Sequence, residues 1–312
     1  MSAPTGDQYP LALESEGRSV AAVVTEVAAG IRSLSVDGVD LVEPFAESST
    51  PPGAAGIVLM PWPNRVAGGR WMLDGAVQQL DITEPKYGNA SHGLLRYTAY
   101  RVVAQEPSRL LQSASVFPQH GYPFRLDTTV EHALTAEGMT VTHTVLNASA
   151  EPAPVAVGAH PYLRIGDVPV EELTVTVDAT TRFVTDERQI PVAEEPVVGT
   201  EYDLAHGRRI GDLAIDDCYG GVAMTDGRSR QRVQAPDGRA VELWADADFG
   251  FVQVFTPPAF ASIDGPRKAI AIEPMTAPAD AFNSGRGLRW LQPGERWELR
   301  WGIRFLAEPS GR

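Results

Sequence analysis

Cysteine is almost absent from this chain of 312 residues, which contains only Cys218. One cysteine excludes a disulfide framework and suits a reducing compartment, so we expect a cytoplasmic protein. The residue could be a nucleophile, but a lone cysteine is more often a small buried apolar side chain.

The sequence also lacks a secretion signal and a membrane-spanning run. Its opening stretch, MSAPTGDQYPLALES, has no cationic segment followed by an apolar one, and no later run approaches the length of a spanning helix. We therefore expect no signal peptide, no membrane partner, and a loose N-terminal arm over about residues 1–10.

Positive charge is scarce as well, with 26 Lys and Arg against 40 Asp and Glu and a net charge of −14. A strongly acidic protein repels phosphate backbones and anionic lipid headgroups. We therefore expect no nucleic-acid partner. Net charge does not describe the local charge of a site.

Helical periodicity is rare, whereas the two-residue period of strands is frequent. Residues 139–145 alternate apolar or histidine side chains with threonines, residues 126–134 show the same pattern, and TAEG between them is typical of a hairpin turn. Five Asp-Gly pairs favour further hairpins, because glycine adopts positive φ easily. They lie at Asp37-Gly38, Asp74-Gly75, Asp226-Gly227, Asp237-Gly238 and Asp264-Gly265.

These patterns predict an all-β fold, a large antiparallel β-sandwich of two packed sheets. We find no linker composition, no repeat at solenoid spacing and no low-complexity tract, so we expect one domain over residues 1–312. Two stretches, 46–56 and about 186–212, are expected to be long loops, and such loops are often functional.

Two histidines stand beside residues that shape the backbone. Pro161 disfavours helical backbone at His160 and favours an extended one, so His160 is expected to end a strand on a rigid mount. A core histidine that donates to a backbone carbonyl is an equally good reading. His92 lies among small residues and Gly93, which allow a ligand to approach closely, although an ordinary loop histidine would have the same surroundings.

A glutamate ends the strand pattern KAIAIE. Glu273 shares a face with Ala269 and Ala271, which would leave space above its carboxylate. The alternative is a solvated glutamate at a sheet edge.

Polar pairs supply further candidates. Arg65, beside Asn64, is a forked donor suited to oxyanions or vicinal hydroxyls, unless it forms a surface salt bridge. Asp216 and Asp217 could accept hydrogen bonds from sugar hydroxyls, but they could also form a turn.

In this order, PWPNRVAGGRW, SHGLLR, VGAHPYLRI, AIDDCY, FVQVFTP and AIEP…AFN resemble the aldose 1-epimerase (galactose mutarotase) family, from about residue 56 to 283. The resemblance implies the galactose mutarotase-like supersandwich, with a sugar bound in a cleft on one curved sheet. It implies interconversion of the α and β anomers of a free hexose such as glucose or galactose. The partner is then a small sugar, and we expect a monomer or homodimer.

By motif, the resemblance makes His160 the general acid, Glu273 the general base and His92 a second active-site histidine. Residues implied to contact the sugar are Asn64, Arg65, Asp216, Gln253 and Tyr162, with Asp217 as the alternative to Asp216. Two departures bear on sugar preference: Pro-Trp-Pro precedes Asn64, and Leu-Arg-Ile follows Tyr162.

Mutarotation consists of proton transfers, so neither a metal nor another cofactor is expected. The sequence has no Walker loop, dinucleotide fingerprint or Cys-x-x-Cys. His92, His160 and Glu273 could be imagined as metal ligands, but their spacing matches no metal motif.

The expected protonation states follow from ordinary pKa values. Glutamate, near ~4.3, is ionised at neutral pH, whereas histidine, near ~6.5, is only partly protonated. We expect Glu273 and Asp216 to favour the imidazolium of His160 by opposite charge. This predicts a bell-shaped pH profile, with Glu273 ionising on one limb and His160 losing its proton on the other.

Three other functions remain open at this point. The first is a hexose-6-phosphate 1-epimerase, for which Arg65, Arg70, Arg96 and Arg164 could supply cations. The second is a non-catalytic carbohydrate-binding protein, which would not need an acid–base pair. The third is a glycoside hydrolase with Asp216 and Glu273 as paired carboxylates.

Overall fold

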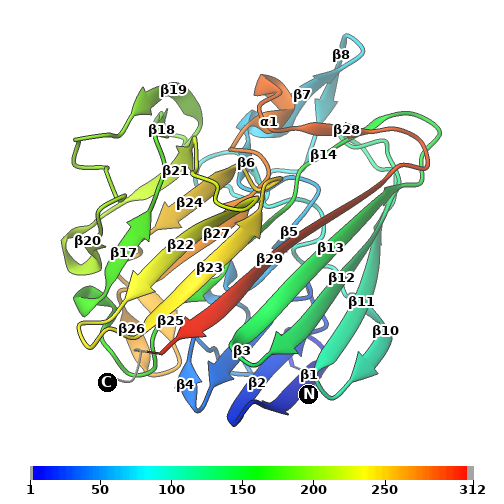
Figure 1. The fold of residues 1–312 in the computed structure, drawn as a ribbon. Helices are drawn as coiled ribbons and strands as arrows, with labels where there is room; N and C mark the ends of the chain where they lie inside the picture. The colour runs from blue at the N-terminus through cyan, green and yellow to red at the C-terminus, as the bar shows by residue number, and fades with distance from the viewer. Residues whose placement is uncertain (1–2, 308–312) are drawn as a thin grey trace.

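The computed structural model describes residues 3–307, and it consists mainly of antiparallel strands, as expected (Figure 1). A nine-stranded sheet lies at the front of Figure 1 and an eight-stranded sheet lies behind it. A four-stranded N-terminal sheet lies at the bottom of the view. The structure confirms the predicted all-β sandwich.

The nine-stranded sheet has the order β10(Arg101–Glu106), β11(Arg109–Val116), β12(Leu126–Thr135), β13(Gly138–Asn147), β29(Arg296–Leu306), β23(Ala240–Asp246), β22(Arg228–Gln234), β17(Thr174–Val177) and β20(Arg208–Arg209). The eight-stranded sheet has the order β19(Pro191–Pro196), β18(Thr181–Thr185), β21(Asp216–Gly220), β24(Phe251–Phe255), β27(Ile270–Met275), β15(Gly158–Ala159) and β5(Val58–Leu59), with β16(Tyr162–Leu163) also paired to β27. The N-terminal sheet comprises β1(Gln8–Ser15), β2(Arg18–Thr25), β3(Ile31–Val36) and β4(Val39–Asp40).

Short elements connect these sheets. Four two-stranded pairs are β6(Arg65–Val66) with β9(Ala90–Ser91), β7(Arg70–Leu73) with β8(Ala76–Gln79), β14(Ala153–Val155) with β28(Arg289–Leu291), and β25(Phe260–Ser262) with β26(Gly265–Arg267). The helical turns are η1(Pro52–Ala54), η2(Ala67–Gly69), η3(Val170–Glu172), η4(Ile210–Asp212) and α1(Ala281–Ser284). No helix within residues 3–307 is long and apolar enough to cross a membrane.

The predicted alternation matches the burial of β12 and β13. In β13 the even-numbered threonines are partly exposed, whereas Val141, His143 and Val145 are buried. The two strands form a hairpin in which Thr135 pairs with Gly138, as the TAEG turn predicts. Their inward side chains belong to one apolar core that also includes Val254 of the eight-stranded sheet.

Three of the five Asp-Gly pairs have the geometry of a type I′ turn, in which both central residues have positive φ. These are Asp37-Gly38, Asp74-Gly75 and Asp226-Gly227. At the other two pairs only the glycine has a positive φ, so the pairs mark turns of another kind.

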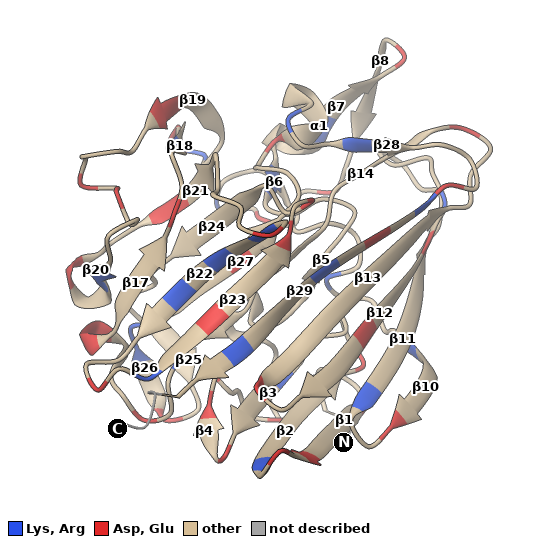
Figure 2. Cartoon of the chain, in the orientation of Figure 1, with Lys and Arg blue, Asp and Glu red and all other residues tan. Residues whose placement is uncertain are grey.

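The outward face of the nine-stranded sheet carries charges on neighbouring strands. Figure 2 shows basic and acidic residues side by side on β22, β23 and β29. Arg304 Nη2 lies 2.7 Å from Glu242 Oε1, and Arg230 Nε lies 3.7 Å from the same oxygen. Opposite charges on adjacent strands stabilise the pairing of a solvated face.

The N-terminal segment differs from the expected loose arm. Strand β1 begins at Gln8, which pairs with Thr25, and Thr5 is buried. Backbone hydrogen bonds from Glu26 and Val27 also fasten residues 5–7. The expectation therefore fails for residues 3–10, because backbone pairing does not require an amphipathic pattern; residues 1–2 lie outside the described range.

The two expected loops have different outcomes. Residues 46–56 contain only the short turn η1 and contribute to the cavity described below. The stretch 186–212 contains β19, β20 and η4, so the expectation of one long loop is wrong there. The prolines and glycines of this stretch suggested a loop, although β19 and β20 pair with β18 and β17 at the sheet edges.

Candidate active site

A cavity of about 610 Å³ is lined by residues of the eight-stranded sheet and of the segments around residues 51–54, 64–65 and 83–96. The sheet residues come from β21, β24 and β27 and point away from the core, because their neighbours Val254 and Ile272 point into it. Seven of the eight site residues predicted from the sequence line this cavity. They are Asn64, Arg65, His92, His160, Asp216, Gln253 and Glu273.

The registers of three adjacent strands fix the floor of the cavity. Gln253 of β24 lies opposite Glu273 of β27, and on its other side β24 pairs with β21, where Asp216 lies opposite Phe255. Residues paired across antiparallel strands share a face, so all four side chains project to the same side. A slip of one residue in β24 would turn Gln253 into the core.

His160 occupies the short break between β15 and β16. Its backbone N–H donates to Ile57 O at 3.1 Å, its carbonyl accepts from Gly56 N at 2.9 Å, and Pro161 O accepts from Ile272 N. These bonds hold the extended segment that Pro161 favours, in agreement with the expected rigid mount.

Asn64 and His92 line the cavity from segments outside the eight-stranded sheet, and both have left-handed backbone, with φ of 55° and 62°. His92 N–H donates to Asn64 O at 2.7 Å, which fastens the two segments to each other. Left-handed backbone in residues other than glycine carries strain, and such residues concentrate at functional sites.

His160 and Glu273 are in direct contact. His160 Nε2 lies 3.3 Å from Glu273 Oε1, and the two residues are only 5% and 2% exposed. The His92 ring meets the His160 ring edge-on, with centroids 5.4 Å apart. His160 Nδ1 and Glu273 Oε2 have no hydrogen-bond partner among the described protein atoms.

Burial dominates the electrostatics of this pair. Burial, aided by the positive charges of Arg96 and Arg65 and opposed by a backbone hydrogen bond, lowers the pKa of His160 to about 3. Burial also raises the pKa of Glu273 well above its ordinary value, with Asp216 raising it and Arg65 opposing. Because burial disfavours the charged form of each group, the neutral imidazole and the neutral carboxyl are favoured.

This result corrects the expected protonation states. From the sequence we expected an imidazolium at His160, stabilised by Glu273 and Asp216, and an ordinary pKa for Glu273. That expectation follows from opposite charges nearby, but desolvation is the larger effect at both groups. The pair therefore holds one proton over a wide pH range.

A chain of hydrogen bonds crosses the cavity floor. Arg65 Nε and Nη2 donate to Glu84 at 2.7 and 3.0 Å, and Arg65 Nη1 donates to Asn64 Oδ1 at 3.2 Å. Asn64 Nδ2 donates to Gln253 Oε1 at 3.2 Å, and Gln253 Nε2 donates to Asp216 Oδ1 at 2.6 Å. Each amide is thereby oriented by its neighbours, so the polar groups are held ready for a ligand.

The structure distinguishes the two adjacent aspartates. Asp216 lines the cavity, and burial raises its pKa while Arg65 lowers it. Asp217 alternates to the other face of β21, where its Oδ1 lies 2.8 Å from Arg182 Nη1. Asp216 is therefore the aspartate available to a ligand in this cavity.

Tyr162 is placed behind the cavity, and it is not among the residues that line it. Its ring stacks against His160 at 5.2 Å between centroids and packs on Phe260 at 4.5 Å. The hydroxyl donates to Gly53 O at 3.2 Å. Tyr162 also packs with Ala269 and Ala271, so the space above these alanines is filled by its ring. The Glu273 carboxyl does face open space, because it lines the cavity.

Several cavity residues were not nominated from the sequence, and of those named here only Phe255 belongs to a quoted motif, FVQVFTP. Glu84, Lys86 and Tyr87 come from the irregular segment between β8 and β9, and Phe255 comes from the end of β24. Only the aromatic side chains carry a signal for sugar binding, since an aromatic ring can cover the apolar face of a pyranose.

Metal binding has no support from the geometry. Within residues 3–307, no three His, Cys, Asp or Glu side chains are placed to hold a metal ion together. Cys218 is free and buried, and burial raises its pKa well above the ordinary value, which leaves it a protonated thiol.

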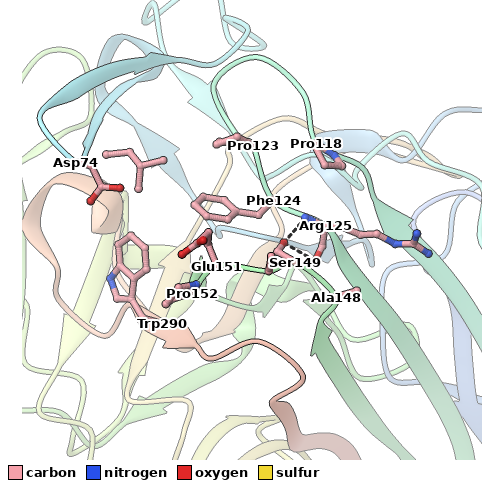
Figure 3. Close-up of a pocket in the computed structure, with 12 residues that line it drawn as sticks. Asp74, Pro118, Pro123, Phe124, Arg125, Ala148, Ser149, Glu151, Pro152 and Trp290 are labelled. Atoms are coloured by element: carbon pink, nitrogen blue, oxygen red, sulfur yellow. Dashed lines mark hydrogen bonds between the residues drawn. The ribbon is translucent and has the colours of Figure 1, made fainter.

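A second cavity, of about 780 Å³, lies between the β7–β8 turn, the segments 118–125 and 148–152, and Trp290 (Figure 3). Figure 3 shows the carboxylates of Asp74 and Glu151 near the indole. No histidine is among the residues that line this cavity. We place the candidate active site in the first cavity, where a buried histidine and a carboxyl are in contact.

Comparison with known proteins agrees with the fold and with the motifs. A family model described as aldose 1-epimerase matches residues 11–304. The uncharacterized protein YihR of Escherichia coli (strain K12) is 29% identical over 283 residues, which cover 90% of this chain and 89% of that protein.

Two solved structures share the fold. A GalM/aldose epimerase homologue from C. elegans has a TM-score of 0.82 at 18% identity, and the alignment covers 96% of this chain and 99% of the homologue. A galactose 1-epimerase from Lactobacillus acidophilus NCFM has a TM-score of 0.74 at 16% identity, and the alignment covers 96% of this chain and 98% of that protein. At such identities the similarity shows the fold alone.

Proposed function

The chain belongs to the aldose 1-epimerase family, and we propose that it interconverts the α and β anomers of an aldohexose by acid–base ring opening and reclosure. The observation that supports this most strongly is the contact between His160 and Glu273 in a cavity large enough for a sugar. A non-catalytic sugar-binding protein would not need such a pair.

Ring opening moves two protons at one carbon centre. The C1 hydroxyl must lose a proton, and the ring oxygen, which is bonded to the same C1, must gain one. Glu273 takes the proton from the C1 hydroxyl while His160 gives a proton to the ring oxygen. Rotation about the C1–C2 bond then presents the other face of the aldehyde, and the same two groups run the reverse step.

The protonation states of His160 and Glu273 are consistent with this cycle. Before ring opening, Glu273 is ionised and His160 carries the proton; afterwards Glu273 carries a proton and His160 is neutral. The second state is the one that burial favours. The first is reached by proton transfer across the 3.3 Å contact, and the charge of Arg65 lowers the pKa of Glu273 and so aids its ionisation.

The remaining side chains position the sugar. Asp216, Gln253 and Asn64 present fixed acceptors and donors for hydroxyl groups along the cavity floor. Tyr87 and Phe255 offer apolar surface for the face of the ring. Positioning of this kind reduces the entropy cost of bringing C1 between acid and base.

The function is tested by polarimetry on freshly dissolved α-anomers of several aldoses, with His160→Ala as the control and each spontaneous rate subtracted. The proposal requires faster mutarotation with the wild-type protein and loss of most of that acceleration in the variant. Failure to accelerate any aldose would refute it.

A further inference from the structure

The cations of the candidate active site are not equally available to a ligand. Arg65 forms a bidentate ion pair with Glu84, so its charge is already balanced. Of the other arginines that a phosphorylated substrate could use, Arg164 is buried against Glu43 and exposed Arg70 hydrogen-bonds to Gln79, and neither lines the cavity.

Arg96 differs from these three, because it lines the cavity and has no carboxylate within ion-pair distance among residues 3–307. Its guanidinium makes one hydrogen bond to protein, from Nη1 to Ser91 O at 3.2 Å, and rests over the Tyr97 ring at 4.8 Å. Its Nε is buried without a protein partner. An arginine has five N–H donors, so most of the fork is unused.

Lys86 adds a second unmatched cation at the same cavity. It is exposed, its Nζ lies 4.5 Å from the Tyr87 ring centroid, and it forms no ion pair with the described residues. With Glu273 kept neutral by burial, the unbalanced side-chain charges around this cavity are Arg96, Lys86 and the opposing Asp216. The cavity is thus locally cationic in a protein whose net charge is −14.

The position of Arg96 indicates which part of a sugar it would meet. Arg96 Nη1 donates to the carbonyl of Ser91, and Ser91 directly precedes His92, whose ring meets the His160 ring edge-on. Arg96 therefore lies on the histidine side of the cavity. In the proposed function His160 faces the ring oxygen, which is bonded to C1 and C5, and C5 carries C6. A group on C6 therefore lies on the side of the sugar that His160 and Arg96 share.

We propose that the substrate is a hexose with an anionic group on C6, a carboxylate, sulfonate or phosphate, held by Arg96 with help from Lys86. This inference rests on the proposed function and names the substrate class of the same site. Charge-assisted hydrogen bonds to an oxyanion are shorter and stronger than those to a neutral hydroxyl, so such a substituent would distinguish the substrate from free hexose.

The test compares mutarotation of one hexose, its uronate, its 6-sulfonate and its 6-phosphate, each corrected for its own spontaneous rate. We expect kcat/KM for at least one anionic sugar to exceed that for the free hexose by about tenfold or more. Arg96→Gln should lower kcat/KM for that sugar about 10- to 100-fold, whereas the free hexose should change by less than about threefold because it forms no ion pair.

Arg70→Gln is the matched control, since Arg70 is an exposed arginine outside the cavity, and it should leave both substrates unchanged. Should Arg96→Gln not fold, the wild-type protein still gives an answer. Between about 0.02 and about 0.3 M salt, kcat/KM should fall for the anionic sugar and stay flat for the free hexose, because salt screens the ion pair.

Two results would overturn the inference while leaving the proposed function intact. One is a preference for the free hexose over all three anionic sugars. The other is an equal loss with both kinds of substrate in Arg96→Gln. Absence of mutarotation with every sugar would overturn the proposed function and this inference with it.

Discussion

Glu273 Oε1 lies 3.3 Å from His160 Nε2, although Glu273 belongs to β27 and His160 lies in the break between β15 and β16. Two groups this close titrate as a unit. Their shared burial works against a charge on either one, so the pair keeps a single proton over a wider pH range than isolated side chains, which share one proton only between about pH 4.3 and 6.5.

The pH dependence of kcat/KM should therefore show a broad plateau. Its acid limb requires protonation of His160, whose pKa is lowered to about 3, and its alkaline limb requires ionisation of Glu273, whose pKa is raised well above its ordinary value. We expect rates within about twofold of each other between about pH 5.5 and 8, since kcat/KM reports the free enzyme.

A stopped-flow or polarimetric profile in buffers of constant ionic strength gives this result, with circular dichroism to confirm folding at each pH. A half-loss of kcat/KM near pH ~6.5, the ordinary pKa of histidine, would show that burial does not control His160.

The two neighbouring aspartates of β21 provide a matched pair of variants. Asp216→Ala should raise KM about tenfold or more because it removes a charged acceptor for sugar hydroxyls and frees the Gln253 amide. Asp217→Ala should alter KM by less than about threefold, because Asp217 contacts Arg182 on the other face of β21 and does not line the cavity.

Both KM values come from initial mutarotation rates, and thermal denaturation shows that each variant is folded. Equal effects of the two substitutions on KM would mean that the orientation of β21 does not select the ligand-facing aspartate.

Two histidines in the sandwich core should link stability to pH. His143 Nε2 accepts a hydrogen bond from Trp301 Nε1 at 2.9 Å, and burial lowers the pKa of His143 to about 4 and that of His132 to about 3. The unfolded chain, with histidines near ~6.5, binds more protons than the native state in this range. Stability should thus fall as the pH drops from about 6.5 to about 4, by roughly 1.4 kcal/mol per pH unit for each histidine.

Urea denaturation at several pH values measures this slope. His143→Gln keeps an acceptor for Trp301 and removes the titrating ring, so the slope should decrease by about one proton. His206→Gln, at an exposed position, is the control. An unchanged slope in His143→Gln would contradict the account of the core.

The fold was predictable where burial follows a simple period. The alternation in residues 126–134 and 139–145 predicted β12 and β13, and Asp-Gly pairs predicted several turns. The pairing of Gln253 with Glu273 was not predictable, since register between strands depends on the whole sheet. Neither was the strand β1, which is fastened by backbone hydrogen bonds that depend little on the identity of the side chains.

The candidate site was predictable to the extent that motifs mark it. Sequence alone nominated His160, Glu273 and Asn64, and the structure brings them together. It could not nominate Glu84, an ordinary loop residue whose importance arises from contact with Arg65. It also misjudged the charge state of His160, because the depth of burial is a property of the folded chain.

A double-mutant cycle on kcat is the most direct test of the central claim that His160 and Glu273 act together on one anomeric centre. His160→Asn and Glu273→Gln should each lower kcat for mutarotation by about 10²- to 10⁴-fold. The double variant should be no more than about threefold slower than the slower single variant, because groups that act as a unit are strongly non-additive. A double variant whose loss equals the product of the two single losses, or a single variant with wild-type kcat, would contradict the account.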